Sequence, residues 1–287
     1  MARPLRVEYP GALYHVVSRG NEQKNIFKDN VDRLKFLDWV KDAIEIHNLI
    51  CHAYCLMNNH YHILIETPDA NLSKAMRDIN GNYTQWFNSR HRRAGHLLQG
   101  RYKSFIIEKE TYLLEVARYI VLNPVRAKFV KHPNEWKWSS YKSTAGHNKI
   151  PDWLHTDWTL GFFGKNRKKA QNNYRQFVKD GMNADDPHNE AKNGFLLGSP
   201  QFIHWIWETK TRGSEKLIEH TREQRIVGRP TLNELFDGIQ TLKERDGAIK
   251  MARMRCGYTA VEISRHVSLH PSVIGRISKG KYNTKSQ

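Results

Sequence analysis

The sequence predicts an α+β fold, in which a ferredoxin-like βαββαβ domain is followed by an all-α helix-turn-helix C-terminal domain. Three observations predict it. Two β-rich segments with alternating apolar residues, Ile50–Met57 and His60–Glu66, are joined by Asn58-Asn59, a pair suited to a tight hairpin turn. Segments with helical spacing of apolar residues lie before and after this hairpin. Short helical patterns follow Pro230.

The other elements of the first domain follow from periodicity. Tyr14 to Ser18 is a short β-rich run closed by Gly20, and Tyr102 to Glu108 is the last strand. A first helix over residues 31–47 and a second helix after the hairpin each place apolar residues on one face. These residues are Leu34, Leu37, Val40 and Ile44 in the first helix, and Leu72, Met76, Ile79, Tyr83 and Trp86 in the second.

A third helix is predicted from Thr111 to Asn123. The Thr111 hydroxyl can accept a hydrogen bond from a free backbone N–H, and Pro124 is expected to end the helix because it lacks an N–H. A basic polar helix is expected around residues 168–180. The polar run 183–190 is predicted to be a linker.

The predicted domain boundaries place the first domain and its basic helical extension at residues 1–182. A linker and connecting helix occupy 183–229, and the helix-turn-helix domain occupies 230–287. In the last domain, two short helices meet at a tight turn at Ser268-Leu269, which leaves Ser272, Arg276 and Lys279 on the outer face of the second. Their apolar residues are Val261, Ile263 and Val267, then Val273, Ile274 and Ile277. A small packing bundle with a solvated basic face is the alternative.

The charge of the chain points to a polyanionic partner. Its 287 residues contain 46 Lys and Arg against 29 Asp and Glu, a net charge of +17, so nucleic acid is the first candidate. No apolar run approaches the roughly 20 residues of a spanning helix, and no apolar signal core follows Met1. We therefore expect a cytoplasmic protein without a membrane partner. The three cysteines are expected to be reduced thiols.

His60 and His62 are the first candidates for chemistry. Side chains alternate along a strand, so both imidazoles point to one face of the predicted hairpin, about 7 Å apart. Neutral imidazoles can share one metal ion that takes further ligands from elsewhere. Taken alone, such a pair is also compatible with surface or core histidines.

The predicted third helix adds a tyrosine and an amide. At about 100° per residue, Tyr119 and Asn123 lie on a different side from the apolar cluster of that helix. Residues four apart face the same space, so the Asn123 carbonyl oxygen can reach a metal beside the Tyr119 hydroxyl. Nitrogen and oxygen ligands with open positions suit Mg²⁺ or Mn²⁺. A half-buried aromatic and a capping amide are the alternative interpretation.

Together, three segments resemble the REP-associated tyrosine transposases, a branch of the single-tyrosine HUH (His-hydrophobic-His) nucleases related to insertion-sequence transposases. They are Met57-Asn58-Asn59-His60-Tyr61-His62-Ile63-Leu64-Ile65-Glu66, Gly100-Arg101-Tyr102-Lys103 and Ala117-Arg118-Tyr119-Ile120-Val121-Leu122-Asn123-Pro124-Val125-Arg126-Ala127. The N-terminal run Gly11-Ala12-Leu13-Tyr14-His15-Val16-Val17-Ser18-Arg19-Gly20-Asn21 and Trp138-Ser139-Ser140-Tyr141 fit as well. The resemblance is close over residues 1–145 and looser to about 182. Residues 258–279 are weakly similar to the helix-turn-helix of the replication initiator DnaA.

The resemblance implies metal-dependent cleavage and strand transfer of single-stranded DNA. It assigns His60 and His62 as metal ligands, Asn123 as a third ligand and Tyr119 as the nucleophile that forms a 5′-phosphotyrosine. The implied partners are hairpins from palindromic repeats, with duplex DNA bound by the C-terminal domain, in a nucleoid-associated monomer or homodimer. The expected DNA-contacting cations are Arg19, Arg101, Lys103, Arg126, Arg276 and Lys279, with Tyr102 available to stack on a base.

Two other functions remain open from the sequence. One is a non-catalytic DNA-binding regulator that recognises palindromic repeats, and the other is a metal-dependent RNA phosphodiesterase that uses water. Because every candidate chemical residue precedes Pro124, the sequence also predicts that nicking of a short hairpin survives removal of the chain from Asn183 onward.

Overall fold

The computed structural model describes residues 7–191, 195–211, 230–256 and 258–278. The chain divides into two compact units. One consists of residues 8–191 with 196–199, and the other contains residues 200–287 with two short segments, 1–7 and 192–195. Each unit is described by itself below. Within the described residues, no helix is long and apolar enough to cross a membrane.

The first unit is built on one mixed sheet. Its strands are β1 (Ala12–Arg19), β2 (Ile50–Leu56), β3 (His60–Thr67), β4 (Lys103–Ile107) and β5 (Leu196–Leu197). They lie in the order β2-β3-β1-β4-β5, antiparallel except for the parallel pair β4–β5. With two helices interposed, the chain order is βαββαβ, which confirms the predicted α+β, ferredoxin-like architecture.

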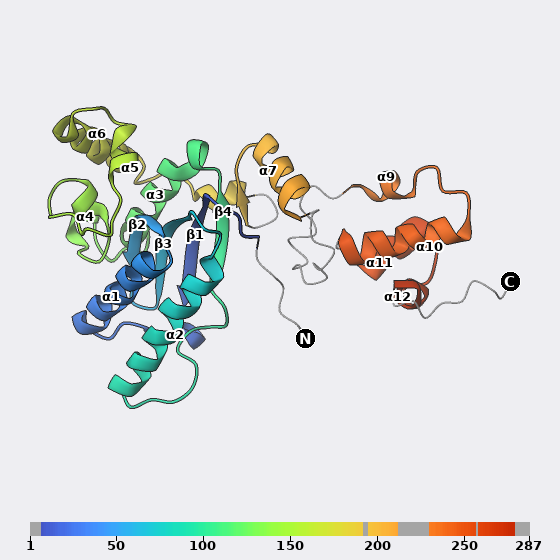
Figure 1. The fold of residues 1–287 in the computed structure, drawn as a ribbon, viewed down its shortest axis with the longest axis horizontal. Helices are drawn as coiled ribbons and strands as arrows, with labels where there is room; N and C mark the ends of the chain where they lie inside the picture. The colour runs from blue at the N-terminus through green and yellow to red at the C-terminus, as the bar shows by residue number, and fades with distance from the viewer. Residues whose placement is uncertain (1–6, 192–194, 212–229, 257, 279–287) are drawn as a thin grey trace. The chain divides into compact units, whose positions relative to one another are not determined.

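Helices α1 (Asn30–Ile46) and α2 (Leu72–Arg90) lie side by side over one face of this sheet (Figure 1). The Tyr61 side chain of β3 points to this face, where its ring centroid lies 4.6 Å from that of Phe36. The predicted apolar face of α1 is wrong at one position. Leu34 is 56% exposed and Phe36 is buried instead, because the packed face is the row of residues spaced by four that contains Phe36, Val40 and Ile44.

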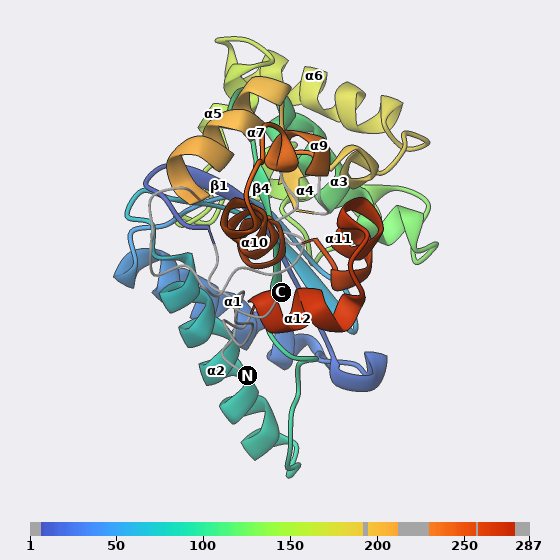
Figure 2. The same cartoon turned by 90° about the vertical axis from the view of Figure 1, so that its right-hand side faces the viewer.

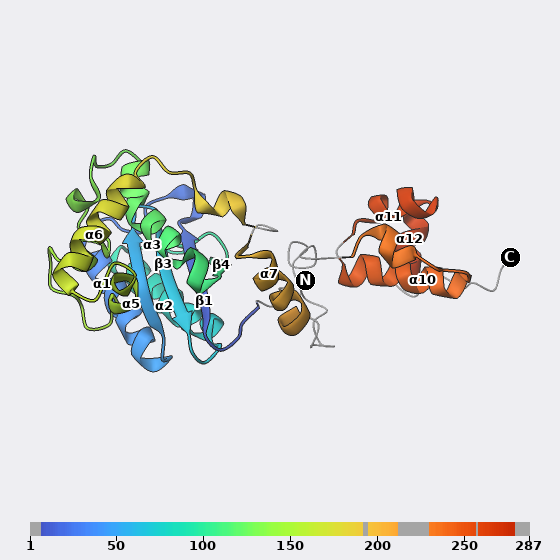
Figure 3. The ribbon, with the colours of Figure 1, turned by 90° about the horizontal axis from the view of Figure 1, so that it is seen from above.

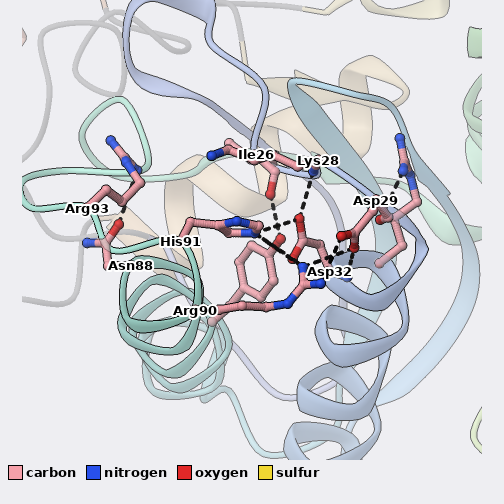
Figure 4. A network of polar contacts seen from close by, with 10 residues as sticks. Ile26, Lys28, Asp29, Asp32, Asn88, Arg90, His91 and Arg93 are labelled. Carbon is pink, nitrogen blue, oxygen red and sulfur yellow. Dashed lines mark hydrogen bonds and ion pairs between the residues drawn. The ribbon is translucent and has the colours of Figure 1, made fainter.

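Polar contacts connect the start of α1 to the end of α2 (Figure 4). Asp29 caps α1 by accepting a hydrogen bond from the Asp32 amide, and its carboxylate pairs with Arg90 at 2.8 Å. Asp32, which is fully buried, accepts hydrogen bonds from the Lys28 amide at 2.7 Å and lies 2.9 Å from the His91 ring nitrogen. The buried carboxylate is thus surrounded by donors from both helices.

Helix α3 (Lys109–Arg126) covers the other face of the sheet and differs from the prediction at both ends. Thr111 lies inside the helix, and Glu108 is the residue that precedes its first turn. Pro124 does not end the helix, which continues to Arg126. The proline removes the N–H that would bond to the Ile120 carbonyl, and the Asn123 side-chain amide lies 3.5 Å from that oxygen in its place.

Smaller helical elements complete the first unit. Helix α6 (Arg167–Asp180) packs beside α5 (Asp157–Gly161), and both pack on the C-terminal half of α3 through buried Leu122, Tyr141 and Tyr174 (Figure 3). The remaining short elements are η1 (Asn21–Gln23), η2 (Pro133–Glu135), α4 (Tyr141–Thr144) and η3 (Pro187–Glu190). Cys51 and Cys55 are buried, free thiols, and Cys256 is buried in the second unit.

The second unit is helical. Its elements are α7 (Pro200–Ile206), η4 (Trp207–Thr211), α9 (Leu232–Phe236), α10 (Leu242–Lys250), η5 (Met251–Arg255), α11 (Ala260–Val267) and α12 (Pro271–Ser278). Ile249, Ile263, Ile274 and Ile277 form its core, but Val261 is 48% exposed, contrary to the prediction.

Helices α11 and α12 are joined by a turn in which Ser268 has φ 54° (Figure 2). Ser272 and Arg276 are exposed on α12 as predicted, while Lys279 lies outside the described residues.

Candidate functional site

The candidate site lies on the face of the sheet that α3 covers. Alternation along β3 directs His62 and Leu64 to this face, where Leu64 packs among residues of α3. The ring centroids of His60 and His62 are 5.0 Å apart, closer than the separation of about 7 Å expected along the strand. His62 is buried, and His60 is partly exposed at the end of the strand.

Helix α3 brings Tyr119 to the histidines. The ring centroid of Tyr119 lies 6.1 Å from that of His62, in an edge-on arrangement. The guanidinium of Arg126, two helical turns further on, lies 5.2 Å from the Tyr119 ring centroid. Burial raises the pKa of the Tyr119 hydroxyl to about 12, assisted by the negative charge of Asp186 and by its capacity to accept a hydrogen bond from the hydroxyl. A group that accepts this proton is therefore required for attack at neutral pH.

Asn123 lies one turn beyond Tyr119 and is partly buried. Its side-chain nitrogen donates a hydrogen bond to the Tyr119 carbonyl at 3.0 Å. That bond occupies the nitrogen, and the amide oxygen is the atom that a metal ion would use. Among the contacts of the described residues, none joins Asn123 directly to His60 or His62, so its role as a ligand stays a prediction.

Three further residues in the site were not predicted from the sequence: His15, Asp186 and His188. His15 on β1 lies 2.8 Å from His62, measured from Nε2 to Nδ1. Its Nδ1 lies 2.7 Å from His188 Nε2, and His188 Nδ1 lies 2.7 Å from Asp186 Oδ1. A continuous row of side chains therefore leads from the candidate metal ligand to a carboxylate that faces Tyr119.

The sequence contained a signal for only one of these three residues. His15 falls on the same strand face as Val17 and Arg19, which pair with His62 and His60. Strand pairing could have identified it. Asp186 and His188 lie in the polar run that reads as a linker, and nothing in its composition indicates a site.

Several contacts bind this run to the first unit. The Arg126 guanidinium donates hydrogen bonds to the backbone carbonyls of Ala184 and Asp185, the latter at 3.2 Å. Tyr112 donates to Glu190 at 3.0 Å. Arg126, one of the cations expected to contact DNA, is thus already engaged by the protein's own backbone. Asp186 and His188, which follow residue 182, lie beside Tyr119. We therefore no longer expect nicking to survive removal of the chain from Asn183 onward.

The imidazoles of the site are held neutral. Burial lowers the pKa values of His15 and His62 well below the ordinary value, and neighbouring histidines lower them further. Burial and the charge of Arg19 lower the pKa of His60 to about 4. Burial also lowers the pKa of His188, against the opposing effect of Asp186. Neutral imidazole is the form that binds metal ions.

These residues fit a metal ion in one specific respect. His62 Nε2 is buried and has no hydrogen-bond partner among the described residues, although the other ring nitrogen is bonded to His15. A buried nitrogen with a lone pair and no donor is the atom that a divalent ion would satisfy. No cluster of three or more His, Cys, Asp or Glu side chains suited to a metal occurs in the described residues.

The other predicted DNA contacts are spread over the surface. Arg19, Arg101 and Lys103 are exposed on the first unit. Tyr102 is 7% exposed, with its hydroxyl 3.4 Å from Ser73 Oγ, so the prediction that it stacks on a base is wrong. Tyr102 immediately precedes β4, and its ring is buried there.

A cavity of about 310 Å³ lies beside the turn that precedes His60. Its lining combines three cations, two amides and an apolar surface: Lys24, Lys28, Arg93, Asn21, Asn25, Phe87 and Leu97. The loop that forms one wall is bound to the hairpin turn, through Gly20 N to the Asn59 carbonyl at 2.7 Å and Ile26 N to the Asn58 carbonyl at 3.0 Å. The cavity and His60 are therefore positioned by the same turn.

A known protein family and solved structures match parts of this chain. Residues 9–123 match the family described as "Transposase IS200 like". A solved structure, "Structure of the REP associates tyrosine transposase bound to a REP hairpin", aligns over 54% of this chain and 92% of its own, with 18% identity and a TM-score of 0.45. A putative transposase from Deinococcus radiodurans R1 aligns over 42% of this chain and 95% of its own, with 17% identity and a TM-score of 0.31. No curated protein matches the chain.

The matched family segment contains both histidines of β3, Tyr119 and Asn123, the residues that the motifs singled out. It ends within α3, so the second unit and the polar run that holds Asp186 lie outside it. Residues 9–123 of this chain are therefore similar to the IS200-like transposases.

Proposed function

We propose that the protein is a metal-dependent endonuclease and strand transferase that acts on single-stranded DNA hairpins through a 5′-phosphotyrosine intermediate. The observation that carries the proposal is the edge-on approach of Tyr119 to His62, whose Nε2 is buried without a partner among the described residues. A nucleophile and a vacant ligand nitrogen thus share one face of the sheet. The match of residues 9–123 to a transposase family supports DNA as the substrate.

His60 and His62 would hold the ion with Asn123, and Mg²⁺ or Mn²⁺ suits this set of nitrogen and oxygen donors. When bound, the ion polarises a non-bridging oxygen of the scissile phosphate. The protein's part is to keep both imidazoles neutral and to hold the Tyr119 ring beside them, with Arg126 over the ring.

The reaction is a transesterification. The Tyr119 oxygen attacks phosphorus, the bond from phosphorus to the 3′ oxygen breaks, and the 3′ oxygen takes a proton from water. The hydroxyl proton passes to the Asp186 carboxylate, which accepts a hydrogen bond from that hydroxyl. Because the phosphotyrosine retains the bond energy, a 3′-hydroxyl can attack it and reseal a strand.

Covalent labelling tests this function. Wild-type protein incubated with Mn²⁺ and a hairpin oligonucleotide labelled on its 3′ side should shift in denaturing gel electrophoresis. Tyr119→Phe should abolish the shifted band, because it removes the attacking oxygen, and should leave hairpin affinity within about twofold.

The matched control is Tyr112→Phe. This variant removes a hydroxyl from the same helix, but that hydroxyl bonds to Glu190 and does not face the histidines. It should retain the covalent band. A band that persists in Tyr119→Phe, or a product released without any labelled protein, would refute the proposed nucleophile. The second outcome would favour hydrolysis by water.

A further inference from the structure

In the row of side chains from His62 to Asp186, elementary chemistry decides which atom of each contact donates the proton and which accepts it. It consists of three contacts between ring nitrogens or a ring nitrogen and a carboxylate, at 2.8, 2.7 and 2.7 Å. Each contact needs one proton, carried by one of its two atoms. A neutral imidazole has one N–H donor and one acceptor nitrogen, so the role of one nitrogen decides the role of the other.

The assignment starts at the carboxylate. Asp186 is a pure acceptor when ionised, and it also accepts from the His188 amide at 2.9 Å. Its partner His188 Nδ1 must therefore carry the proton, which leaves His188 Nε2 as an acceptor. His15 Nδ1 must then donate to His188, and His15 Nε2 becomes an acceptor.

The same rule fixes the last member. His62 Nδ1 must donate to His15 Nε2, and His62 Nε2 is left with a bare lone pair. This is the atom that is buried without a partner among the described residues. The opposite direction would place an N–H there instead, and buried N–H groups without acceptors are rarer than acceptors without donors.

The assignment requires that all three imidazoles are neutral and that Asp186 is ionised. His15 is 1% exposed and His62 is 6% exposed, so a charge on either ring is costly. Burial tends to raise the pKa of Asp186, but hydrogen bonds from the His188 backbone and ring, together with that from Tyr119, outweigh it and lower this pKa.

We propose that Asp186, acting through His188 and His15, holds His62 in the tautomer that carries its proton on Nδ1 and presents an unprotonated Nε2 to the metal ion. Asp186, His188 and His15 are positioning residues in this role. The inference rests on the proposed function in one respect, the use of His62 as a metal ligand. It adds an outer set of residues that lies partly outside the family segment, which ends at residue 123.

Nitrogen NMR of the metal-free protein tests the tautomer without any DNA. In protein labelled with ¹⁵N-histidine, His62 Nε2 should show the shift of an unprotonated nitrogen and His62 Nδ1 that of a protonated one. Asp186→Ala should remove this bias, since the row loses its terminal acceptor. His188→Leu removes both nitrogens of His188 from the row while keeping the Asp186 carboxylate, and it should have the same effect.

Metal affinity provides a second measurement. Partners of metal-binding histidines typically contribute 10-fold to 100-fold to affinity, so Mn²⁺ titration by calorimetry should show a loss on the order of 10-fold or more in Asp186→Ala. Glu190→Ala is the matched control, because Glu190 lies on the same segment but bonds to Tyr112. Asp186→Asn retains an acceptor oxygen and should recover the wild-type tautomer in part.

The inference is overturned if wild-type His62 carries its proton on Nε2, or if Asp186→Ala and His188→Leu leave both tautomer and Mn²⁺ affinity unchanged. It fails separately from the proposed function. A wild-type protein that has the expected tautomer and binds Mn²⁺, but forms no covalent band with DNA, refutes the nuclease and leaves the positioning role intact.

Discussion

At the scale of residues, the site depends on imidazoles that remain neutral where histidine is ordinarily charged. The cause is burial at one face of the sheet, with Arg19 adding to it at His60. Neutrality favours metal binding and also has a thermodynamic consequence. An unfolded chain exposes the same imidazoles to water, where they take up protons near their ordinary pKa of about 6.5.

We therefore predict that the metal-free protein loses stability as the pH falls from about 6.5 to about 4. In this window the unfolded state binds more protons than the folded state, because the folded His60 titrates only near about 4. The contribution is fully present above the unfolded pKa and is lost as the pH falls through the folded one. Each buried histidine should contribute a slope of up to about 1.4 kcal/mol per pH unit.

Urea unfolding at intervals across this window measures the slope. His60→Gln should flatten it by removing one titrating group. A free energy of unfolding that does not change between pH 6.5 and 4.5 would contradict the assignment of neutral imidazoles.

At the scale of elements, the contacts between α1 and α2 stabilise the helical layer on the sheet face opposite α3. Asp32 has no exposed surface and pairs with Arg90 and with His91. Removal of one member of a buried charged cluster leaves the others without compensation, which typically costs about 3 to 5 kcal/mol. Asp32→Ala should therefore lower the free energy of unfolding by about 3 kcal/mol.

The control is Asp38→Ala on the same helix. Its carboxylate is 63% exposed and lies 3.8 Å from Lys35, and such surface pairs contribute less than about 1 kcal/mol. Equal losses in the two variants, measured by urea unfolding, would show that the Asp32 cluster does not stabilise the helix pair.

We expect a DNA strand to bind in the cavity beside the hairpin turn. Lys28 lies 5.9 Å from the Phe87 ring centroid and Arg93 lies 5.8 Å from it. Arg93 is held by neutral acceptors, Asn88 and the His96 carbonyl, and neither cation forms an ion pair within the described residues (Figure 4). Two uncompensated charges over an apolar surface suit the phosphates and a base or sugar of an unpaired strand.

Lys28→Gln with Arg93→Gln should weaken binding of a single-stranded oligodeoxythymidylate. With about 0.7 units of log-log salt slope per phosphate contact in single strands, the double variant should lose about 1.4 units. The control is Lys35→Gln with Lys41→Gln, which removes the same charge from ion-paired positions on α1. Fluorescence anisotropy at several salt concentrations measures the slopes. Equal slopes in the two double variants would exclude the cavity from DNA binding.

At the scale of the whole molecule, the chemical residues and the second unit are connected by a run that is itself part of the site. Asp186 and His188 reach the site from beyond residue 182, and β5 adds Leu196–Leu197 to the sheet. A protein truncated after Ser199 retains these contacts, and one truncated after Met182 loses them. The first should nick a single-stranded hairpin at a rate near that of the full chain, and the second should lose most of this activity.

Single-turnover nicking of the hairpin distinguishes these cases, with circular dichroism as the check on folding. The truncation after Ser199 should also bind DNA with duplex segments more weakly than the full chain, because it lacks the exposed Arg276 on α12. If the shorter protein nicks as fast as the longer one, Asp186 is neither the acceptor of the Tyr119 proton nor needed for the metal site.

The sequence alone determined the local features of this protein. Alternation along β3 was sufficient to place His60 and His62 on one face, because it depends on backbone geometry within a single element. Helical spacing predicted Tyr119 on a different side from the apolar cluster of α3, but the Tyr119 ring packs against that cluster. The βαββαβ order followed from the same periodicities, and the structure confirms it.

Contacts between distant segments were decided only by the tertiary structure. Local sequence cannot show that the His15 ring meets that of His188, 173 residues away, or that Arg126 binds the run around Asp185. The same limit explains the errors at Leu34 and Val261, where apolar residues are exposed, and at Pro124, which remains helical. Which face is buried, and whether a proline is tolerated, depends on what packs against a helix, and that is a property of the folded chain.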